Sequence, residues 1–277
     1  MLSRVKTYAA KINRFFIGKK LFQGFYRLLY TFVPQDLFFK IRAKIDPFPN
    51  KINESINQRE ILNFYSIFIN SGDLCFDVGA NIGNRTDVFL KLGAKIVCIE
   101  PQDTCIKILN RLYGNNSNVI ILNKGLAEKE GHLEIYIGED ATTISTMSEK
   151  WMKEGRFSTD YEWTRTQLVP VTTLDALINK YGLPKFCKID VEGFEHNVLK
   201  GLSNPIPFIS FEFTREFFDD AKKCINHLLS IDHAEFNCSI GESSQLLFSS
   251  WITPEELYKK IDSFEDKTLW GDIYVKF

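Results

Sequence analysis

Residues 74–92 join an apolar run, a glycine-rich turn and a helical pattern, and this combination limits the fold more than any other segment. The run LCFDV (74–78) is short, apolar and rich in strand-forming residues. The turn Asp77-Val78-Gly79-Ala80-Asn81-Ile82-Gly83 overlaps its end, and a helical stretch follows at 84–92. A strand that enters a helix through a glycine turn is the first half of a βαβ unit. The segment therefore predicts a parallel sheet.

Short apolar runs of the same kind recur along the chain. They lie at 96–99, 119–122, 186–189 and 207–213, and a second helical stretch lies at 103–112. Strands that alternate with helices form a parallel sheet with helices on both faces. The sequence therefore predicts an α/β, Rossmann-like domain with a mostly parallel sheet.

Two regions depart from this alternation. Residues 132–171 contain strand patterns that predict an inserted β element, and the polar, aromatic segment 148–166 within it is predicted to be a loop or lid. Three further runs near the C-terminus predict antiparallel strands at the edge of the sheet. They lie at 234–240, 245–248 and 272–277.

Basic residues are concentrated at the N-terminus. Residues 1–60 contain 12 Lys/Arg and 4 Asp/Glu, whereas the remainder contains 22 and 31. Apolar residues recur with helical spacing between 21 and 29, and Asp-Pro-Phe-Pro-Asn (46–50) ends the helical pattern. We therefore predict a basic helical extension over residues 1–50 and a main domain over residues 51–277. The extension packs its apolar stripe on the main domain, makes peripheral contact with an anionic membrane or, as a third alternative, is a transit peptide.

Composition argues against several classes of protein. The formal net charge of −1 does not fit a nucleic-acid-binding protein with a basic surface. No apolar stretch approaches the roughly 20 residues that span a bilayer, and no apolar core of a secretory signal is present. The six cysteines form no C-x-x-C pair and the four histidines show no zinc-ligand spacing with them. Cysteines within apolar runs are typical of a reducing compartment, so we expect a cytoplasmic protein.

The glycine turn predicts a ligand site at the carboxyl end of the first strand. Gly79 and Gly83 allow a tight turn and a close approach of ligand to backbone. Their spacing is G-x-x-x-G, which differs from the G-x-G-x-x-G of dinucleotide-binding proteins. Asp77 would repel a pyrophosphate in the turn but suits a ligand that carries an ammonium and a sulfonium group. Charge therefore favours S-adenosylmethionine over NAD.

Glu100 supports the same ligand. It ends the run IVCIE, 21 positions after Gly79. An acidic residue about 20 positions after the turn accepts hydrogen bonds from ribose hydroxyls in dinucleotide sites. We expect Glu100 to do so here.

With these motifs in place, the chain resembles the FkbM-type methyltransferases, a family of S-adenosylmethionine-dependent O-methyltransferases. The similar segments span residues 76–275 in the family's order, and KIDVEG is the most distinctive of them. They are FDVGANIGNRT (76–86), IEP (99–101), VPVTTLDAL (169–177), KIDVEGFEHNVLKG (188–201) and WGDIYV (270–275). The resemblance implies a class I methyltransferase fold with an antiparallel sheet edge, and S-adenosylmethionine as the cofactor.

The resemblance also implies the cofactor-binding residues. Asp77, Gly79, Asn81 and Gly83 match the cofactor loop, Glu100 matches the ribose-binding acid, and Leu126 lies where the family contacts adenine. Many relatives have a polar residue near the last position. We therefore expect a backbone or packing contact from Leu126.

Acidic residues gather after the fourth predicted parallel strand. Asp190 ends FCKID, Glu192 follows it, and Glu212 lies on the next strand. A base next to a hydroxyl acceptor accelerates its reaction about 10²–10⁴-fold. We nominate Asp190 as the base or the group that orients the acceptor, with Glu192, Glu212 and His196 as rivals. Glu192 and Glu195 also fit a simpler role, since acids stabilise the first turn of a helix. Asp190 and Glu212 alone, on separate strands, are weak evidence for a divalent-cation site, so we expect no metal.

The sequence thus predicts methylation of a hydroxyl on a sugar, glycan or other polar natural product, with a small-molecule or glycan acceptor and no nucleic-acid partner. A nicotinamide-dependent oxidoreductase and a non-catalytic binding protein are the alternatives.

Overall fold

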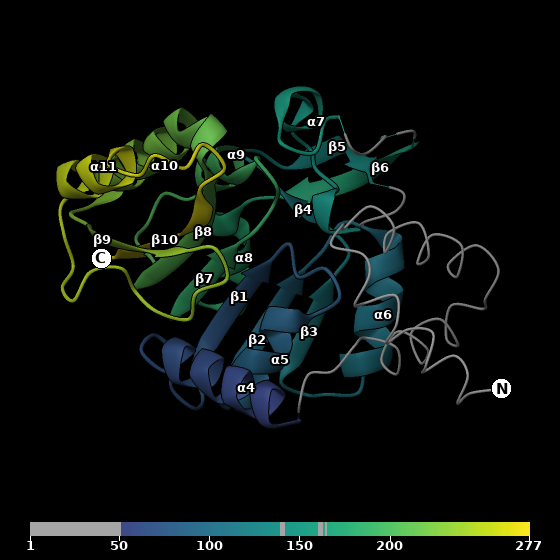
Figure 1. Ribbon diagram of the computed structural model, residues 1–277. Coiled ribbons are helices and arrows are strands. Elements are labelled where there is room, and N and C mark those ends of the chain that lie inside the picture. The colour runs from purple at the N-terminus through teal and green to yellow at the C-terminus, as the bar shows by residue number, and fades with distance from the viewer. Residues whose placement is uncertain (1–50, 139–141, 160–162, 164) are drawn as a thin grey trace, which may run out of the picture. The chain divides into compact units, whose positions relative to one another are not determined.

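The computed structural model describes residues 51–138, 142–159, 163 and 165–277 (Figure 1). The predicted N-terminal extension lies outside these residues. Glu60–Phe277 form one compact unit, which contains every residue of the candidate site. No helix in the described part of the chain combines the length and the hydrophobicity needed to cross a bilayer.

A seven-stranded sheet forms the centre of this unit. Its order is β3-β2-β1-β7-β8-β10-β9, and β10 pairs antiparallel with both neighbours while the first five strands are parallel. The strands are β1 (Leu74–Val78), β2 (Lys95–Ile99), β3 (Val119–Leu122), β7 (Phe186–Ile189), β8 (Phe208–Thr214), β9 (Glu235–Ile240) and β10 (Trp270–Lys276). The predicted Rossmann-like sheet with an antiparallel edge is confirmed. The strand order reverses between β1 and β7, where ligands bind in open α/β sheets.

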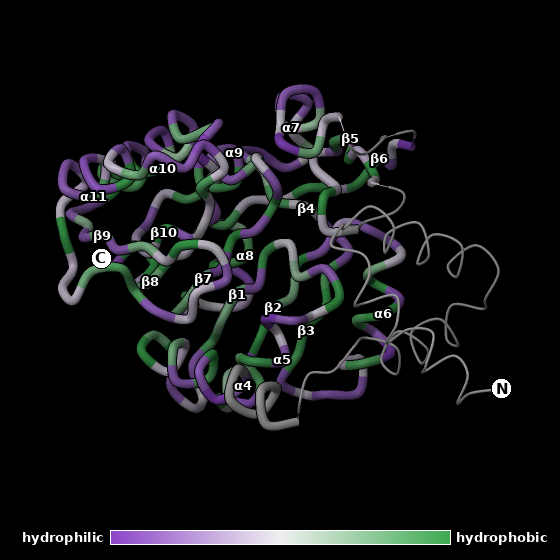
Figure 2. Tube along the Cα trace, in the orientation of Figure 1, coloured by the Kyte–Doolittle hydropathy of each residue, from purple (hydrophilic) through white to green (hydrophobic). Residues whose placement is uncertain are grey.

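Helices cover both faces of the sheet because the strands alternate in the side chains they present. On β1, Cys75 faces a cluster with the aromatic residues Tyr65 and Phe89, whereas Phe76 faces a second cluster with Leu174 and others. The first cluster involves α4 (Lys51–Tyr65), α5 (Asn84–Lys91) and α6 (Asp103–Tyr113). The second involves α8 (Leu174–Tyr181), α9 (Glu195–Leu199), α10 (Phe218–Ile231) and α11 (Pro254–Asp262). Figure 2 shows apolar residues along the strands and hydrophilic residues on α10 and α11.

A three-stranded sheet confirms the predicted β insertion. It has the order β4-β6-β5, with β4 (Gly125–Leu126), β5 (Gly131–Ile137) and β6 (Arg165–Thr172). A short 3-10 helix, η1 (Thr142–Ile144), and helix α7 (Glu149–Glu154) lie between β5 and β6. The expectation of a loop or lid over 148–166 is therefore wrong as regards a loop for 149–154, which are helical, and for 165–166, which begin β6. Ser148 caps this helix by accepting a hydrogen bond from the Trp151 amide.

The C-terminal predictions are confirmed for two of three strands. Residues 235–240 and 270–276 form β9 and β10, but 245–248 form no strand. The side chain of Asn237 on β9 binds this segment instead, by accepting from the Phe248 amide at 3.1 Å and donating to the Phe248 carbonyl at 2.9 Å. Side-chain bonds of this kind replace a regular ladder. The 3-10 helix η2 (Arg215–Phe217) joins β8 to α10.

Candidate active site

The glycine turn after β1 lies against the end of β7. Gly79, Asn81 and Gly83 have φ angles of 79°, 49° and 91°, which are left-handed conformations. The amides of Gly79 and Ala80 both donate to the Ile99 carbonyl. A Cβ at Gly79 would lie 1.8 Å from the backbone oxygen of Asp190. Only glycine therefore allows the predicted cofactor loop to approach the acidic segment so closely.

Glu100 connects the ends of β1 and β2. It is 2% exposed, and its carboxylate accepts from the amides of Asn81 and Gln102, both at 2.8 Å. Burial raises the pKa of Glu100 to about 7, although the two amides oppose the shift. The Gln102 side chain also hydrogen-bonds this carboxylate, which leaves one of its four lone-pair positions for a hydroxyl.

Asp77 is buried beneath α5. Its Oδ2 accepts a hydrogen bond from the Thr86 hydroxyl at 2.6 Å. Burial raises the pKa of Asp77, and the Thr86 bond and the charge of Lys188 oppose that shift. Asp77 therefore links the strand before the glycine turn to the helix after it, and places a carboxylate beneath the turn.

Leu126 lies on β4 of the smaller sheet. It is 2% exposed and belongs to the cluster of buried residues that also contains Val78 and Ile99. The next amide, Ala127, donates to the Thr172 carbonyl. Leu126 is thus part of the same buried core as the strands that carry the glycine turn and Glu100.

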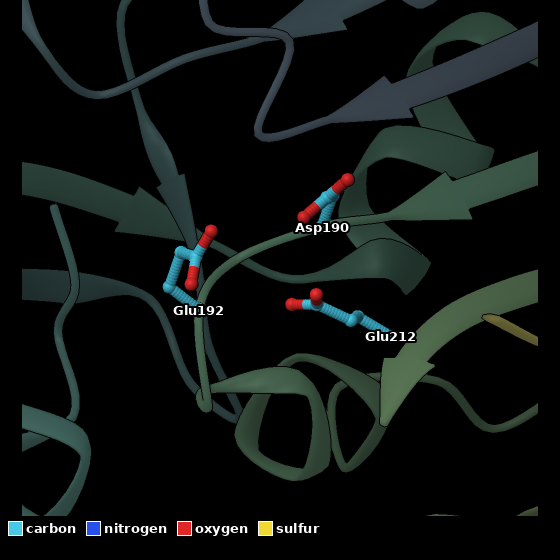
Figure 3. A group of neighbouring side chains, drawn as sticks. All are labelled: Asp190, Glu192 and Glu212. Carbon is cyan, nitrogen blue, oxygen red and sulfur yellow. The ribbon is translucent and has the colours of Figure 1, made fainter. Parts of the chain in front are cut away.

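The three predicted catalytic acids come together at the ends of β7 and β8. Carboxylate oxygens of Asp190, Glu192 and Glu212 lie within 4.8 Å of one another (Figure 3). Asp190 follows the last residue of β7, and Glu212 lies on the adjacent strand β8. Glu192 has a φ angle of 53°, and its carbonyl accepts from the Thr146 hydroxyl at 2.6 Å. This bond ties the segment after Asp190 to the chain that leads into α7.

Lys188 supplies the positive charge next to these acids. Its side chain is 1% exposed, and its ammonium lies 3.1 Å from Asp190 and 2.7 Å from Asp272 on β10. The neighbouring carboxylates raise the pKa of Lys188 well above its ordinary range, against the effect of burial. Lys188 is therefore charged. Of its two ion-pair partners, Asp190 is the one that belongs to the group of three acids.

Glu192 and Glu212 lack such a partner at ion-pair distance within the described residues. Burial first, and nearby carboxylates second, raise the pKa of both well above the ordinary range. Glu195, at the start of α9, has a pKa raised by burial to about 7, and its Oε1 accepts from the amides of Val191 and Gly193. The acid group therefore holds protons near neutral pH. Its carboxylate oxygens are also ligands of the kind that Mg²⁺ prefers, although the sequence led us to expect no metal.

A pocket of about 250 Å³ opens beside Glu212, between α7, α9, β8 and α10. Trp151, Glu195, His196 and Phe217 contribute to its walls. The predicted rival base His196 lies here, and burial lowers its pKa, so its ring is neutral at pH 7.

Comparison with known proteins decides the class. The Methyltransferase FkbM domain matches residues 77–237, more than half of the chain. The chain belongs to the FkbM methyltransferase family. A further relative is the hexuronic acid methyltransferase AglP of Haloferax volcanii, which is 24% identical over 183 residues, 65% of this chain and 71% of that protein. The match to the family model begins at Asp77 and includes Glu100, Asp190, Glu192 and Glu212.

The chain is also similar to solved structures, at low sequence identity. A precorrin-6y C5,15-methyltransferase from Geobacter metallireducens is 9% identical with a TM-score of 0.40, over 83% of this chain and 89% of that one. The protein SMU.1697c from Streptococcus mutans, whose structure is a complex with SAH, is 10% identical with a TM-score of 0.38, over 78% of this chain and 95% of that one.

This FkbM methyltransferase is an S-adenosylmethionine-dependent enzyme, and the described residues fit that cofactor. Glu100 keeps an acceptor position at a buried site, which suits a ribose hydroxyl. Asp77 beneath the turn suits the cationic part of the cofactor. The family assignment decides against a nicotinamide-dependent oxidoreductase.

Two further residues, which we did not predict from the sequence, lie at the candidate site. Lys188 lies two positions before Asp190, so both face the same side of β7, and this spacing is the signal that could have found it. Trp151 lies in the insertion, and nothing in its local sequence indicated that it lines a pocket with Glu212.

Proposed function

We propose that this FkbM methyltransferase transfers a methyl group to a hydroxyl of a sugar. The named activity of the relative from Haloferax volcanii supports a sugar acceptor. The acids at the ends of β7 and β8 support a hydroxyl, because a hydroxyl gains from a base when it is methylated. The observation that carries the proposal is the contact between Gly79 and Asp190, which puts the cofactor loop directly beside the acid group.

Each residue has a role in this proposal. The cofactor, when bound, supplies an electrophilic methyl group on a positively charged sulfur. Gly79, Asn81 and Gly83 shape its loop, and Glu100 accepts from its ribose. Leu126 packs near the adenine, and Asp77 contributes negative charge beneath the turn.

The acids divide the work on the acceptor. Asp190, held by Lys188, orients the hydroxyl by accepting a hydrogen bond from it. Glu192 and Glu212 both have a raised pKa and exchange protons with each other. When one of them is ionised, it accepts the proton of the acceptor hydroxyl. Holding the acceptor oxygen in line with the methyl group contributes further, up to roughly 7–11 kcal/mol in well-oriented systems.

Transfer of a labelled methyl group to a panel of sugars and to non-sugar hydroxyl compounds tests the proposal. We expect Asp190→Asn and Glu212→Gln to lower kcat about 10²-fold or more. Their affinity for S-adenosylhomocysteine, measured by calorimetry, should stay close to that of the wild type. Glu265→Gln, at an exposed position, is the matched control and should leave both quantities unchanged.

Two results would contradict the proposal. Label found only on non-sugar compounds would remove the sugar acceptor. Full turnover in both acid variants would remove the acids from catalysis.

A further inference from the structure

Lys188 on β7 and Asp272 on β10 meet across the intervening strand β8. The register pairs Lys188 with Ser210 on β8, and Ser210 in turn with Tyr274 on β10. Side chains at alternate positions of a strand share a face, so Asp272 and Tyr274 lie on the same face of the sheet as Lys188. Ser210 is fully buried between them, and its small side chain leaves room for the lysine to cross β8.

The ammonium of Lys188 is bound from two sides. The lysine side chain is 1% exposed, and its ammonium donates to Oδ1 of Asp272 at 2.7 Å and lies 3.1 Å from Oδ2 of Asp190. The side chain of Asp272 is 13% exposed, whereas that of Asp190 is 39% exposed. The three charged groups therefore run from the interior of the protein to the proposed reaction centre, and Asp190 is the end that a ligand can reach.

A frame of aromatic rings supports Asp272. Tyr274 is 1% exposed, and its hydroxyl donates to Oδ2 of Asp272 at 3.4 Å. The Tyr274 ring stacks on Phe68 at 5.1 Å, centroid to centroid, and meets Phe64 edge to face at 5.4 Å. Side chains in closely packed interiors sit in single rotamers. The carboxylate of Asp272 is thus fixed, and so is the ammonium bound to it.

Stability alone does not explain three charged groups in this arrangement. A buried ion pair is weak evidence for stability, because the cost of removing charges from water can exceed their attraction. Asp272 alone would neutralise Lys188, yet Lys188 also contacts a carboxylate of the acid group. That contact is with Oδ2 of Asp190, so it orients the carboxylate and leaves Oδ1 as its second acceptor oxygen. A catalytic group that is oriented by a further group recurs in enzyme active sites.

The arginines near the acid group bind carboxylates outside it. Arg85 forms an ion pair with Glu242 at 3.0 Å. Arg156 forms one with Glu216 at 2.7 Å. Among the described residues, Lys188 is therefore the cation that is paired with a member of the acid group.

We propose that Asp272 is a positioning residue for methyl transfer, because it fixes the ammonium of Lys188, which in turn orients the Asp190 carboxylate toward the acceptor hydroxyl. This inference rests on the proposed function, in which Asp190 accepts a hydrogen bond from that hydroxyl. Asp272 itself touches neither cofactor nor acceptor in this proposal.

Asp272→Asn tests the proposal, because it removes the charge and keeps the shape of the side chain. Methyl transfer is measured with the compound of the acceptor panel that the wild type methylates fastest, whether or not it is a sugar. We expect kcat to fall at least about tenfold, since misplacement of a reacting group by about 1 Å can cost about 10²-fold. The KM for S-adenosylmethionine should stay close to the wild-type value. Unchanged kcat in a folded Asp272→Asn protein would overturn the proposal.

Glu235→Gln is the matched control. Glu235 on β9 forms an ion pair with Lys276 on β10 at 3.0 Å, and both side chains are exposed. The substitution breaks a carboxylate–lysine pair of the same sheet that does not involve the acid group, so kcat should equal that of the wild type. A fall as large as that of Asp272→Asn would assign both losses to disturbance of β10 and overturn the proposal.

The pH dependence of kcat tests the role of Lys188. Burial and nearby carboxylates raise the pKa of Glu192 and Glu212, and the charge of Lys188 opposes the shift. Lys188→Met removes that charge, so both acids ionise at higher pH and the acid limb of the profile moves to higher pH. Other charged and titratable groups that face Lys188 or these acids stay unchanged in this variant; they are Tyr65, Asp77, Arg85, Arg156, Asp190, Glu195 and Asp272. A lysine with a purely structural role would lower the rate without moving the limb, so an unmoved limb would overturn the role of Lys188.

The double variant Lys188→Met/Asp272→Asn tests whether Asp272 acts through Lys188. Once Lys188 is replaced, loss of the Asp272 charge should lower kcat no further, whereas independent effects would multiply and overturn the proposal. The double variant also removes both charges together, which a folded protein tolerates better than one uncompensated buried charge. If a single variant does not fold, wild-type kcat in the double variant would overturn the proposal. Calorimetry with S-adenosylhomocysteine reports in every variant that the cofactor site is intact.

Asp190→Asn separates the failure of this inference from the failure of the proposed function. Full turnover in Asp190→Asn would remove Asp190 from the proposed function and overturn this inference with it. Low turnover in Asp190→Asn together with wild-type turnover in Asp272→Asn would overturn the positioning role alone. Label only on compounds that are not sugars would remove the sugar acceptor, while a fall of kcat in Asp272→Asn with such a compound would still support the positioning role.

Discussion

Glu195 illustrates how burial and hydrogen bonding oppose each other at the residue scale. Its side chain accepts from two amides of the turn that follows Asp190, which favours the ionised form. Burial and the charge of Asp190 favour the protonated form, and the balance raises its pKa to about 7. Asp190, Glu192 and Glu212 crowd the same strand ends, with Lys188 as the cation paired to one of them. When some of these carboxyl groups are protonated, the repulsion between their negative charges is smaller in the absence of cofactor.

The raised pKa of Glu195 predicts a pH dependence of stability. The folded state binds a proton more tightly than the unfolded state, so the stabilisation is complete below the ordinary pKa of 4.5 and is lost as pH rises through about 7. For this carboxyl alone the loss is on the order of 3 kcal/mol. Glu195→Gln should therefore flatten the fall in unfolding free energy between pH 4.5 and pH 7, measured by urea denaturation without cofactor.

Exposed Glu154→Gln on α7 is the control for that experiment and should keep the wild-type pH dependence. A wild-type protein whose stability rises over this pH range, with Glu195→Gln identical to it, would contradict the assignment.

The sequence predicted part of this group and missed the rest for a physical reason. Asp190 and Glu212 end neighbouring parallel strands, so a correct sheet prediction places them together. Asp272 binds Lys188 from an antiparallel strand more than 80 positions later, and no local pattern specifies that pairing. The place of Trp151 in the pocket with Glu212 depends on how the insertion packs against α10, which short-range periodicity does not encode.

At the scale of elements, the glycine turn lies between the proposed cofactor site and the acids. A side chain at residue 79 would face two penalties, a φ angle of 79° and a Cβ only 1.8 Å from the Asp190 carbonyl oxygen. The left-handed conformation alone costs roughly 1–2 kcal/mol for a non-glycine residue. The overlap is with backbone, so it is relieved only if the turn moves away from β7.

Gly79→Ala should therefore weaken S-adenosylmethionine binding more than tenfold, beyond its effect on stability. Gly72→Ala separates the two penalties, because Gly72 has a similar φ of 90° with nothing within 4 Å of the added Cβ. That control should lower the unfolding free energy by about 1–2 kcal/mol and leave cofactor affinity unchanged. Calorimetry on both variants provides the measurement. Equal affinity in wild type and Gly79→Ala would show that the turn does not bind the cofactor.

The sequence predicted helices and strands correctly where the apolar pattern was strong. It failed where side-chain hydrogen bonds, and not a regular pattern, hold the backbone in place. The parallel strands are buried on both faces and read as continuous apolar runs, so their positions were clear. Residues 245–248 have a strand-like composition, yet Asn237 binds their backbone and no regular pairing forms. Helix α7 has only six residues and is capped by Ser148. It is too short and too polar to show an apolar helical pattern in the sequence.

At the scale of the whole molecule, charge is divided between the N-terminus and the main domain. Residues 1–50 contain 10 Lys/Arg and 2 Asp/Glu, whereas the chain as a whole has a net charge of −1. The proposed site residues all follow residue 76. Removing the N-terminal segment should therefore leave methyl transfer to a soluble acceptor unchanged.

The same segment should bring the enzyme to an anionic surface. Each basic residue near such a membrane contributes about 1 kcal/mol, and salt screens the attraction over a Debye length of about 8 Å at physiological ionic strength. We expect the full chain to sediment with phosphatidylserine-containing vesicles at low salt and to be released as salt is raised. A variant lacking residues 1–50 should stay in the supernatant at every salt concentration, as should the full chain with neutral vesicles. If both proteins remain in the supernatant with anionic vesicles, the basic segment serves another purpose, such as packing on the main domain.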